Sequence, residues 1–227
     1  MSAAPFSSSV RVAGVACASA LGETVEAQRR AMQTGHSGLR PLAEAGRAEL
    51  ADLPWPVHGG WLAEAAAWRR GRRYGGASNA AVRVAREAMA DAGWTDAERE
   101  EAWIFAGSSR GNAGELLGYW QERRPLRLLA ASNALHSEVA AAVSIELGLR
   151  GPWQVLANGC SAGLDAAGMA WAALRAGLAR RALVVSVELP LLPELLAAFQ
   201  DTRLLAAEAE ADPFHEKTAG FHPAEAV

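Results

Sequence analysis

The 227-residue sequence predicts an α/β layered fold in which a largely parallel sheet lies between helices. Short apolar runs alternate with longer stretches of helical periodicity along most of the chain. Glycine or proline follows most of these helical stretches. With 51% hydrophobic and 21% charged residues, the composition is that of a folded globular chain rather than a disordered one. We expect a single domain over residues 1–227, with an irregular surface insertion at about residues 40–75.

The first third of the chain predicts one strand and one helix before the insertion. Residues 10–22 open with an apolar run and end in small residues, the pattern of a buried strand that feeds a loop. Residues 23–35 have helical spacing, with Thr24 as the candidate N-cap and Gly35 as the stop. The expected apolar face of this helix consists of Val25, Ala27, Ala31 and Met32. The insertion is rich in proline and glycine and is expected to hold one short helix at residues 61–70.

The rest of the chain predicts three helices that alternate with three strands. In chain order these are helix 77–94, strand 101–109, helix 132–152, strand 153–158, helix 161–177 and strand 181–189. The helix at 161–177 is rich in glycine and alanine, which lets a neighbouring backbone approach closely. We therefore expect this helix to be buried between the sheet and another layer.

Charge, hydropathy and cysteine usage exclude several function classes. A net charge of −3 leaves no large basic field that would attract nucleic acid. No apolar run reaches the roughly 18 residues of a membrane-spanning helix, and the first ten residues lack the pattern of a secretory signal. The two cysteines form no spaced framework, which fits a reducing cytoplasm. We expect a cytoplasmic protein with no metal site, no bound cofactor, no nucleic-acid partner and no membrane span.

Two arginine clusters and one glycine-bearing loop are weaker signals. The clusters lie at residues 68–73 and 122–127, and such runs are most often a solvated face. The other interpretation is a docking patch for an acidic partner. The loop "GSSRGNAG" at residues 107–114 could cradle a phosphate with its backbone amides, but it lacks the lysine of a phosphate-binding loop. A plain loop is the better interpretation.

The segment "NGCSAG" places Cys160 between an expected strand and an expected helix. The positive end of the helix dipole favours thiolate over thiol at this position. The backbone N–H groups of the first turn, that of Cys160 among them, are free to stabilise an oxyanion during acyl transfer. Gly159 and Ser161 shape the turn, which resembles the nucleophile elbow of hydrolases. Cys160 is therefore the candidate nucleophile.

A structural role is the alternative interpretation of each cysteine. Taken alone, Cys160 could be a small apolar filler at a crowded helix start. Cys17 lies in an apolar strand end with no activating feature nearby, so we assign it a structural role.

Five motifs in order make the chain resemble the β-ketoacyl-acyl-carrier-protein synthases, the condensing enzymes of fatty acid and polyketide synthesis. Residues 12–42 resemble that family's opening strand, turn and helix, and "LGLRGP" precedes a strand as it does in the family. Residues 158–188 are similar to the nucleophile turn and the helix and strand that follow it. "AAFQDTRLLA" resembles the segment with a pocket-gating phenylalanine, here Phe199, followed by Arg203. Residues 212–227 resemble the Pro-Phe and Gly-Phe stretch of the family.

The chain departs from the family pattern in two respects. It ends at Val227 within an element that usually reads glycine–glutamate–glycine–alanine, and here both glycines are replaced. The family's second half, which carries two catalytic histidines and a lysine, has no counterpart in the sequence. None of the five histidines stands in the family's histidine motifs, so we interpret all of them as surface or structural: His36, His58, His136, His215 and His222.

The resemblance implies a thiolase-like fold: one half, the N-terminal one, of a five-layer αβαβα sandwich with a mostly parallel mixed sheet. It implies that Cys160 accepts an acyl group and that Phe199 gates the acyl pocket, with Asn133 near the dimer interface and that pocket. With a complementary subunit or a C-terminal half, decarboxylative Claisen condensation would follow; this chain alone is expected not to be competent for it. The alternative is a catalytically incomplete subunit, of the chain-length-factor type, that pairs with a full-length ketosynthase.

The expected partners are acyl carrier protein, whose phosphopantetheine carries the substrates, and a homodimer or heterodimer mate that covers an apolar face of the half-fold. Because the carrier is acidic, it would give the arginine clusters a purpose. Two further interpretations stay open: an interaction protein that kept the fold without the chemistry, and a thiolase or hydrolase. The last is the weaker, because a thiolase would carry its cysteine much earlier in the chain.

Overall fold

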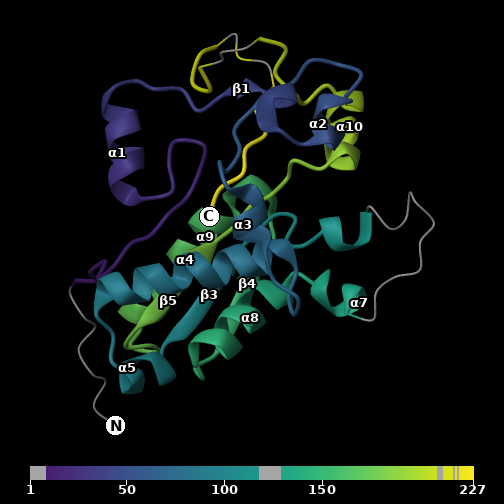
Figure 1. Cartoon of the computed structure of the whole chain (residues 1–227). Coiled ribbons are helices and arrows are strands. Elements are labelled where there is room, and N and C mark those ends of the chain that lie inside the picture. Colours follow the sequence, from purple (N-terminus) through teal and green to yellow (C-terminus); the bar gives the residue numbers. More distant parts are fainter. Residues whose placement is uncertain (1–8, 118–128, 209–211, 217, 219) are drawn as a thin grey trace. The chain divides into compact units, whose positions relative to one another are not determined.

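The computed structural model describes residues 9–117, 129–208, 212–216, 218 and 220–227. The chain folds as two compact units (Figure 1). The sheet unit consists of residues 66–188 with the first sixteen residues and Val227, and the second unit consists of residues 17–65 and 189–226. The single domain expected from the sequence over residues 1–227 stays a prediction.

The sheet unit is built on three parallel strands. The central strand, β3 (Trp103–Gly107), pairs with β4 (Trp153–Leu156) on one side and with β5 (Ala182–Ser186) on the other. All three lie within the ranges predicted from their apolar runs, and their parallel pairing confirms the predicted α/β class. Because the strands are parallel, their carboxyl ends lie at one edge of the sheet.

Three long helices cover this sheet. On one face α9 (Ala162–Arg175) packs its alanines against Phe105. On the other face α4 (Gly76–Ala92) lies beside Val185, and α8 (Ser137–Leu147) packs against α4 (Figure 1). Helix α4 ends at Gly93 with φ +64°, as the sequence predicted. The unit also contains the short helices α5 (Asp96–Glu100), α7 (Ala130–Asn133) and α3 (Ala65–Arg69), the last of which begins at its boundary.

A buried polar cluster holds the N-terminal end of α4. Its members are Ser78, Asn112 and Glu138. Asn112 Oδ1 accepts from Ala77 N at 2.8 Å, and Glu138 Oε1 accepts from the Gly75 amide at 3.2 Å. Asn112 Nδ2 donates to Glu138 Oε2 at 2.6 Å, and the Ser78 hydroxyl donates to the same oxygen. Side chains from distant segments thus satisfy amides that α4 cannot satisfy itself.

The strand predicted at residues 10–22 is wrong. Within this range the structure has only isolated bridges at Ser19 and Gly22, and Val12 is 82% exposed. Gly14 and Val15 lie on α4 instead: a Cβ on Gly14 would meet Ala88 O at 2.4 Å, and the Val15 amide donates to Asp91. Since β5 bonds directly to β3, this segment adds no strand between them.

Two helix predictions need correction. The helix predicted at 132–152 is divided into α7 and α8, because the chain turns at residues 134–136 before α8 begins at Ser137. In the second unit α1 (Val25–Gln33) has the predicted Thr24 cap, whose side chain accepts from Ala27 N at 3.1 Å. However, its predicted apolar face is not a buried one, since Met32 is 71% exposed and only Ala31 is buried.

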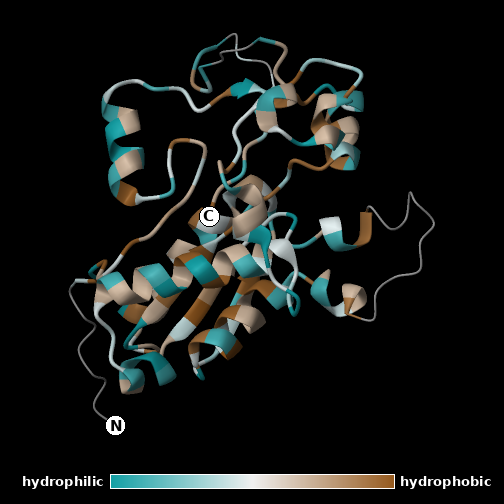
Figure 2. Ribbon diagram, viewed as in Figure 1, coloured by the Kyte–Doolittle hydropathy of each residue, from teal (hydrophilic) through white to brown (hydrophobic). Residues whose placement is uncertain are grey.

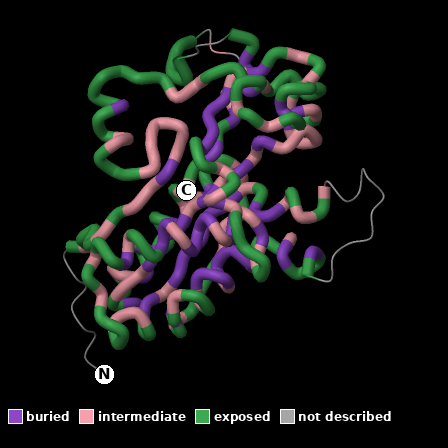
Figure 3. Tube along the Cα trace, viewed as in Figure 1, coloured by how far each residue is buried: buried purple, intermediate pink, exposed green. Residues whose placement is uncertain are grey.

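The second unit has a core of its own. It contains β1 (Arg40–Pro41), η1 (Leu42–Ala45), α2 (Ala48–Ala51), β2 (His58–Gly59) and α10 (Pro193–Asp201). Its buried apolar residues are Leu42, Leu50, Val57, Trp61, Leu191 and Leu196. The stretch predicted as an irregular insertion therefore contributes to a packed core, visible as purple segments in the upper part of Figure 3. The short helix predicted at 61–70 is α3.

A buried ion pair joins distant segments of the second unit. Glu225, whose side chain is 0% exposed, pairs with Arg47 at 2.8 Å. Arg47 also donates to the Leu191 carbonyl at 2.6 Å, and the Glu225 carboxylate accepts from the Leu62 amide at 3.4 Å. The pair thus ties the last residues of the unit to its first segment and to the start of its second.

Candidate active site

The structure places Cys160 on a sharp strand-to-helix turn, here called the cysteine turn (residues 157–161). Strand β4 ends at Leu156, the 3₁₀ turn η2 spans Gly159–Ser161, and α9 begins at Ala162. Gly159 has φ +85°, a conformation that residues with a Cβ rarely adopt. Cys160 is exposed and forms no disulfide. An exposed thiol at a helix N-terminus, where backbone N–H groups point outward, has the geometry of an acyl-accepting nucleophile.

The absence of side chains at Gly107 and Gly163 sets where this turn lies against the sheet. Gly107 ends β3, and a Cβ there would meet the Ala162 carbonyl oxygen at 2.5 Å. A Cβ on Gly163 would meet Ser186 Oγ, at the end of β5, at 2.5 Å. The first turn of α9 therefore lies directly on the carboxyl ends of the two strands.

A carboxylate on α9 ties the two sides of the cysteine turn together. Asp165 Oδ2 accepts hydrogen bonds from the Ser161 hydroxyl at 3.1 Å and from the Asn158 side-chain amide. Asn158 Nδ2 also approaches Ser161 Oγ at 3.4 Å. Cys160 lies between these two residues in the chain, so the Asp165 carboxylate restricts the backbone that carries the thiol.

A half-buried carboxylate, that of Glu188, organises the neighbouring loop. Glu188 Oε1 accepts from the Arg110 amide at 3.4 Å, from Ser108 Oγ at 3.3 Å and from the Ser109 amide. Burial raises the pKa of the Glu188 carboxyl, an effect that these donors oppose. The amides that could have cradled a phosphate are thus used by an internal carboxylate, in agreement with the interpretation of residues 107–114 as a plain loop.

His136 lies at the same carboxyl edge of the sheet. Its Nε2 is 3.1 Å from the Ser109 carbonyl oxygen, which gives the ring a structural contact. In the second unit, His222 Nε2 lies 2.9 Å from the Glu208 carbonyl oxygen. These contacts fit the structural interpretation of the two histidines.

The other predicted site residues have structural contacts that leave their roles open. Asn133, at the end of α7, is buried and donates to the Arg73 carbonyl at 3.1 Å. Phe199, on α10 in the second unit, packs edge-to-face on Phe221 with ring centroids 5.2 Å apart. The roles of Asn133 and Phe199 at an acyl pocket stay predictions.

The two cysteines differ in exposure, while their roles stay predictions. Burial raises the pKa of the Cys17 thiol, so Cys17 stays protonated at neutral pH. Cys160 is exposed on its turn, whereas Cys17 is half-buried.

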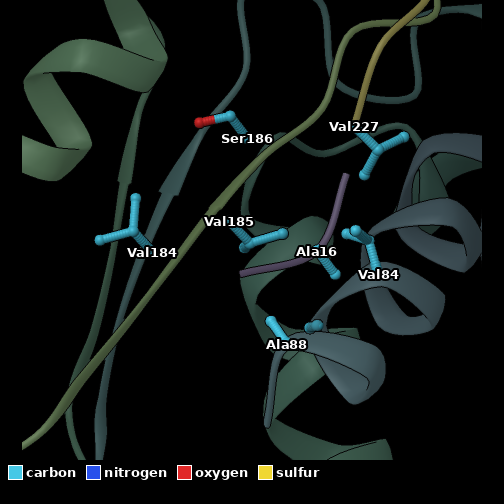
Figure 4. Close-up of a pocket in the computed structure, with 8 residues that line it drawn as sticks. Ala16, Val84, Ala88, Val184, Val185, Ser186 and Val227 are labelled. Carbon is cyan, nitrogen blue, oxygen red and sulfur yellow. The ribbon is translucent and has the colours of Figure 1, made fainter. Parts of the chain in front are cut away.

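An apolar pocket of about 170 Å³ lies elsewhere in the sheet unit, between α4 and β5 (Figure 4). Val84 and Ala88 line it from α4, and Val184 and Val185 line it from β5. The pocket includes no residue of the cysteine turn.

Over the described ranges, three or more potential metal ligands do not come together anywhere. Nor is any helix in those ranges long and apolar enough to cross a membrane.

Gly159, Cys160 and Ser161 lie together on the cysteine turn, and sequence reasoning missed Asp165 and Glu188. A signal for Asp165 was available: it lies four residues after Ser161, which places the two on one face at the start of a helix. No such signal existed for Glu188, because its partners are about 80 residues away in the chain.

Comparison with sequence families gives one match over almost the whole chain. A family described as "Beta-ketoacyl synthase, N-terminal domain" matches residues 7–227. The curated relatives include the highly reducing polyketide synthase sphB of Aspergillus fumigatus, 31% identical over 146 residues, which cover 64% of this chain and 6% of that protein. The pikromycin polyketide synthase component PikAII of Streptomyces venezuelae is 32% identical over 151 residues, which cover 62% of this chain and 4% of that protein. The chain thus corresponds to a small part of these relatives.

Solved structures show the same fold. The ishigamide ketosynthase/chain length factor superposes with a TM-score of 0.78 at 20% identity, covering 94% of this chain and 55% of that one. A β-ketoacyl synthase from Burkholderia phymatum gives a TM-score of 0.76 at 21% identity, covering 95% and 56%. A third is the AntDE:AntF complex, described as a type II acyl-carrier protein with its ketosynthase bound to the hexaketide. Its TM-score is 0.74 at 21% identity, and the match covers 95% of this chain and 55% of that one. The fold is therefore that of the N-terminal half of a ketosynthase, and the chain belongs to the β-ketoacyl synthase N-terminal domain family.

Proposed function

We propose that this chain accepts an acyl group on Cys160 from an acyl carrier protein, as a component of fatty acid or polyketide synthesis. The observation that carries the proposal is the exposed Cys160 on a strand-to-helix turn in a member of the β-ketoacyl synthase family. The acidic carrier would dock on the cluster at residues 68–73, where Arg70 and Arg72 are exposed. The proposed location is the cytoplasm.

The first step is thioester exchange. The Cys160 thiolate attacks the carbonyl carbon of the acyl thioester, and the oxyanion that forms is stabilised by backbone N–H groups of the turn, including that of Cys160. The bond to the phosphopantetheine sulfur then breaks, and the carrier thiolate takes up a proton. Gly159 and Ser161 hold the turn, while Phe199 and Asn133 are the proposed pocket residues.

Condensation is the second step of the proposal and needs more than this chain. A malonyl thioester loses carbon dioxide, and the resulting enolate attacks the acyl carbonyl on Cys160 and releases the thiolate. The enolate needs stabilisation that the family draws from its second half. We therefore assign this step to an assembly with a complementary subunit or a C-terminal half.

The alternative is a catalytically incomplete subunit that pairs with a full-length ketosynthase and shapes its acyl pocket, as a chain-length factor does. One observation favours it: one of the similar structures is a ketosynthase/chain length factor. In this case Cys160 would remain unacylated.

The test is intact-protein mass after incubation with an acyl-loaded carrier protein or an acyl-CoA. The proposal expects one acyl adduct that is lost in Cys160→Ala and kept in Cys17→Ala, the matched control. No adduct on a folded protein would reject acyl transfer and favour the subunit role. In that event a tagged full-length ketosynthase should retain the chain in a pull-down.

A further inference from the structure

Glu188 follows the carboxyl end of β5, and its side chain bonds to the loop that follows a different strand, β3. Its Oε1 atom accepts from Ser108 Oγ at 3.3 Å, from the Arg110 amide at 3.4 Å and from the Ser109 amide. Ser108 Oγ also accepts from the Gly111 amide at 2.8 Å. One carboxylate oxygen thus gathers donors from three consecutive residues after β3.

The position of this carboxylate is unfavourable for its charge. Burial raises the pKa of the Glu188 carboxyl, and the three donors and the nearby Arg110 charge oppose that effect. Hydrogen bonds to an ionised acceptor are roughly twice as strong as those between neutral groups. The ionised carboxylate therefore holds the loop at residues 108–110 more firmly than a neutral side chain would.

The loop that Glu188 holds is bonded to the strand that carries the cysteine turn. The Ser108 amide donates to the Leu156 carbonyl at 3.1 Å, and Leu156 is the last residue of β4, directly before the turn. On the other side, the Val187 amide donates to the Gly107 carbonyl at 3.1 Å. The carboxyl ends of all three strands are therefore connected where the first turn of α9 lies on them.

We propose that Glu188 is a positioning residue for acyl transfer to Cys160, acting through the loop at residues 108–110. The carboxylate fixes this loop, the Ser108 amide fixes the end of β4, and the end of β4 fixes the cysteine turn with its backbone N–H groups. The role of Glu188 is to orient these groups, and it neither exchanges a proton nor forms a bond with the substrate. The effect on acyl transfer rests on the proposed function, whereas the link between Glu188 and the turn does not.

The rate of acyl adduct formation, measured by intact-protein mass over a range of acyl-CoA concentrations, tests the effect on the reaction. Glu188→Ala should lower the maximal rate by about 10- to 100-fold, because a displacement of about 1 Å in a reacting group has an effect of this size. The half-saturating acyl-CoA concentration should not change. Glu188→Gln should recover most of the rate, because its side-chain oxygen still accepts from the loop amides.

Glu98→Ala is the matched control. Glu98 accepts from the Thr95 amide at 2.9 Å and bonds to Arg181, just before the amino end of β5. This variant removes a carboxylate from the opposite end of the same strand and should keep the wild-type maximal rate. Equal maximal rates in the wild-type chain and Glu188→Ala would overturn the proposal, as would an equally large loss in Glu98→Ala.

Hydrogen–deuterium exchange tests the link to the turn without an acyl donor. The slow amides of residues 153–166, from β4 through the first turn of α9, should exchange faster in Glu188→Ala but not in Glu98→Ala. The expected increase is about tenfold, the factor that corresponds to the loss of one hydrogen bond to a charged group. Unchanged exchange over residues 153–166 would overturn the proposal even if residues 108–110 exchange faster. A wild-type chain that forms no adduct would instead reject the proposed acyl transfer, and exchange would still decide whether Glu188 holds the turn.

Discussion

Replacing Gly107 by alanine tests whether the contact between β3 and α9 positions the nucleophile. The new Cβ would meet the Ala162 carbonyl oxygen at 2.5 Å, the Ala162 carbonyl carbon at 2.6 Å and Gly163 Cα at 2.7 Å. All three are backbone atoms, so no side-chain rotation relieves the overlap. Ordinary van der Waals contact begins at 3.4 Å, so the start of α9 must move away from β3 by about 0.9 Å.

This displacement falls two residues after Cys160. A shift of about 1 Å in a reacting group can lower a rate by about 10²-fold. We therefore expect Gly107→Ala to reduce the rate of Cys160 acylation by about 10- to 100-fold. Overpacking should also lower the free energy of unfolding by about 1–3 kcal/mol. Alanine is otherwise the better strand residue by roughly 0.5–1 kcal/mol, so the loss can be attributed to the overlap.

The assay is the rate of acyl adduct formation by mass spectrometry, with urea unfolding of the same samples. Gly76→Ala is the matched control, because its new Cβ would approach only the flexible Arg69 side chain, at 3.2 Å. Wild-type acylation and stability in Gly107→Ala would refute the inference that this close contact positions the cysteine turn. A loss of stability with an unchanged acylation rate would show that the displacement is absorbed elsewhere in α9.

Three further predictions concern carboxylates. Glu225→Ala removes the buried partner of the Arg47 guanidinium, which keeps Glu49 at 3.0 Å and the Leu191 carbonyl, so urea unfolding should show a loss of about 1–3 kcal/mol. An unchanged midpoint would contradict the role of the pair. Burial raises the pKa of Glu138 above the ordinary 4.5. The native state therefore binds the proton more tightly than the unfolded state does. The free energy of unfolding should fall as the pH rises from about 4.5 through the raised pKa. Glu138→Gln should remove that fall. Parallel curves of unfolding free energy against pH for the two proteins would disprove the role of Glu138. Asp165→Ala frees the Asn158 and Ser161 side chains, so Cys160 acylation should slow by about tenfold, with a normal iodoacetamide adduct at completion as the sign of an intact thiol.

Local sequence signals predicted the elements whose boundaries depend on neighbouring residues. Helix α4 ends at Gly93 and α9 is followed by Gly177, both with positive φ, because these glycines adopt left-handed backbone conformations close to the helix ends. The Thr24 cap of α1 also follows from residues within one turn. For the same reason the cysteine turn could be predicted, since Gly159, Cys160 and Ser161 are consecutive.

Features that depend on distant partners could not be predicted in this way. Residues 10–16 have the composition of a strand, but Gly14 and Val15 contact α4 instead, and the Asp91 partner of Val15 is 76 residues away in the chain. The pattern of polar and apolar residues in helix α1 gave no sign that Met32 would be exposed, since teal and tan bands alternate along the helix (Figure 2). The Glu188 carboxylate and the Arg47–Glu225 pair likewise join segments far apart in the sequence.

The glycines near the active site differ in what requires them. Gly159 is required by its backbone conformation, and Gly107 by the closeness of α9. Gly168 is required by neither: it is within a helix, its φ is not positive and open space surrounds its missing Cβ. Glycine inside a helix costs about 1 kcal/mol relative to alanine, and no close contact with a described residue requires Gly168.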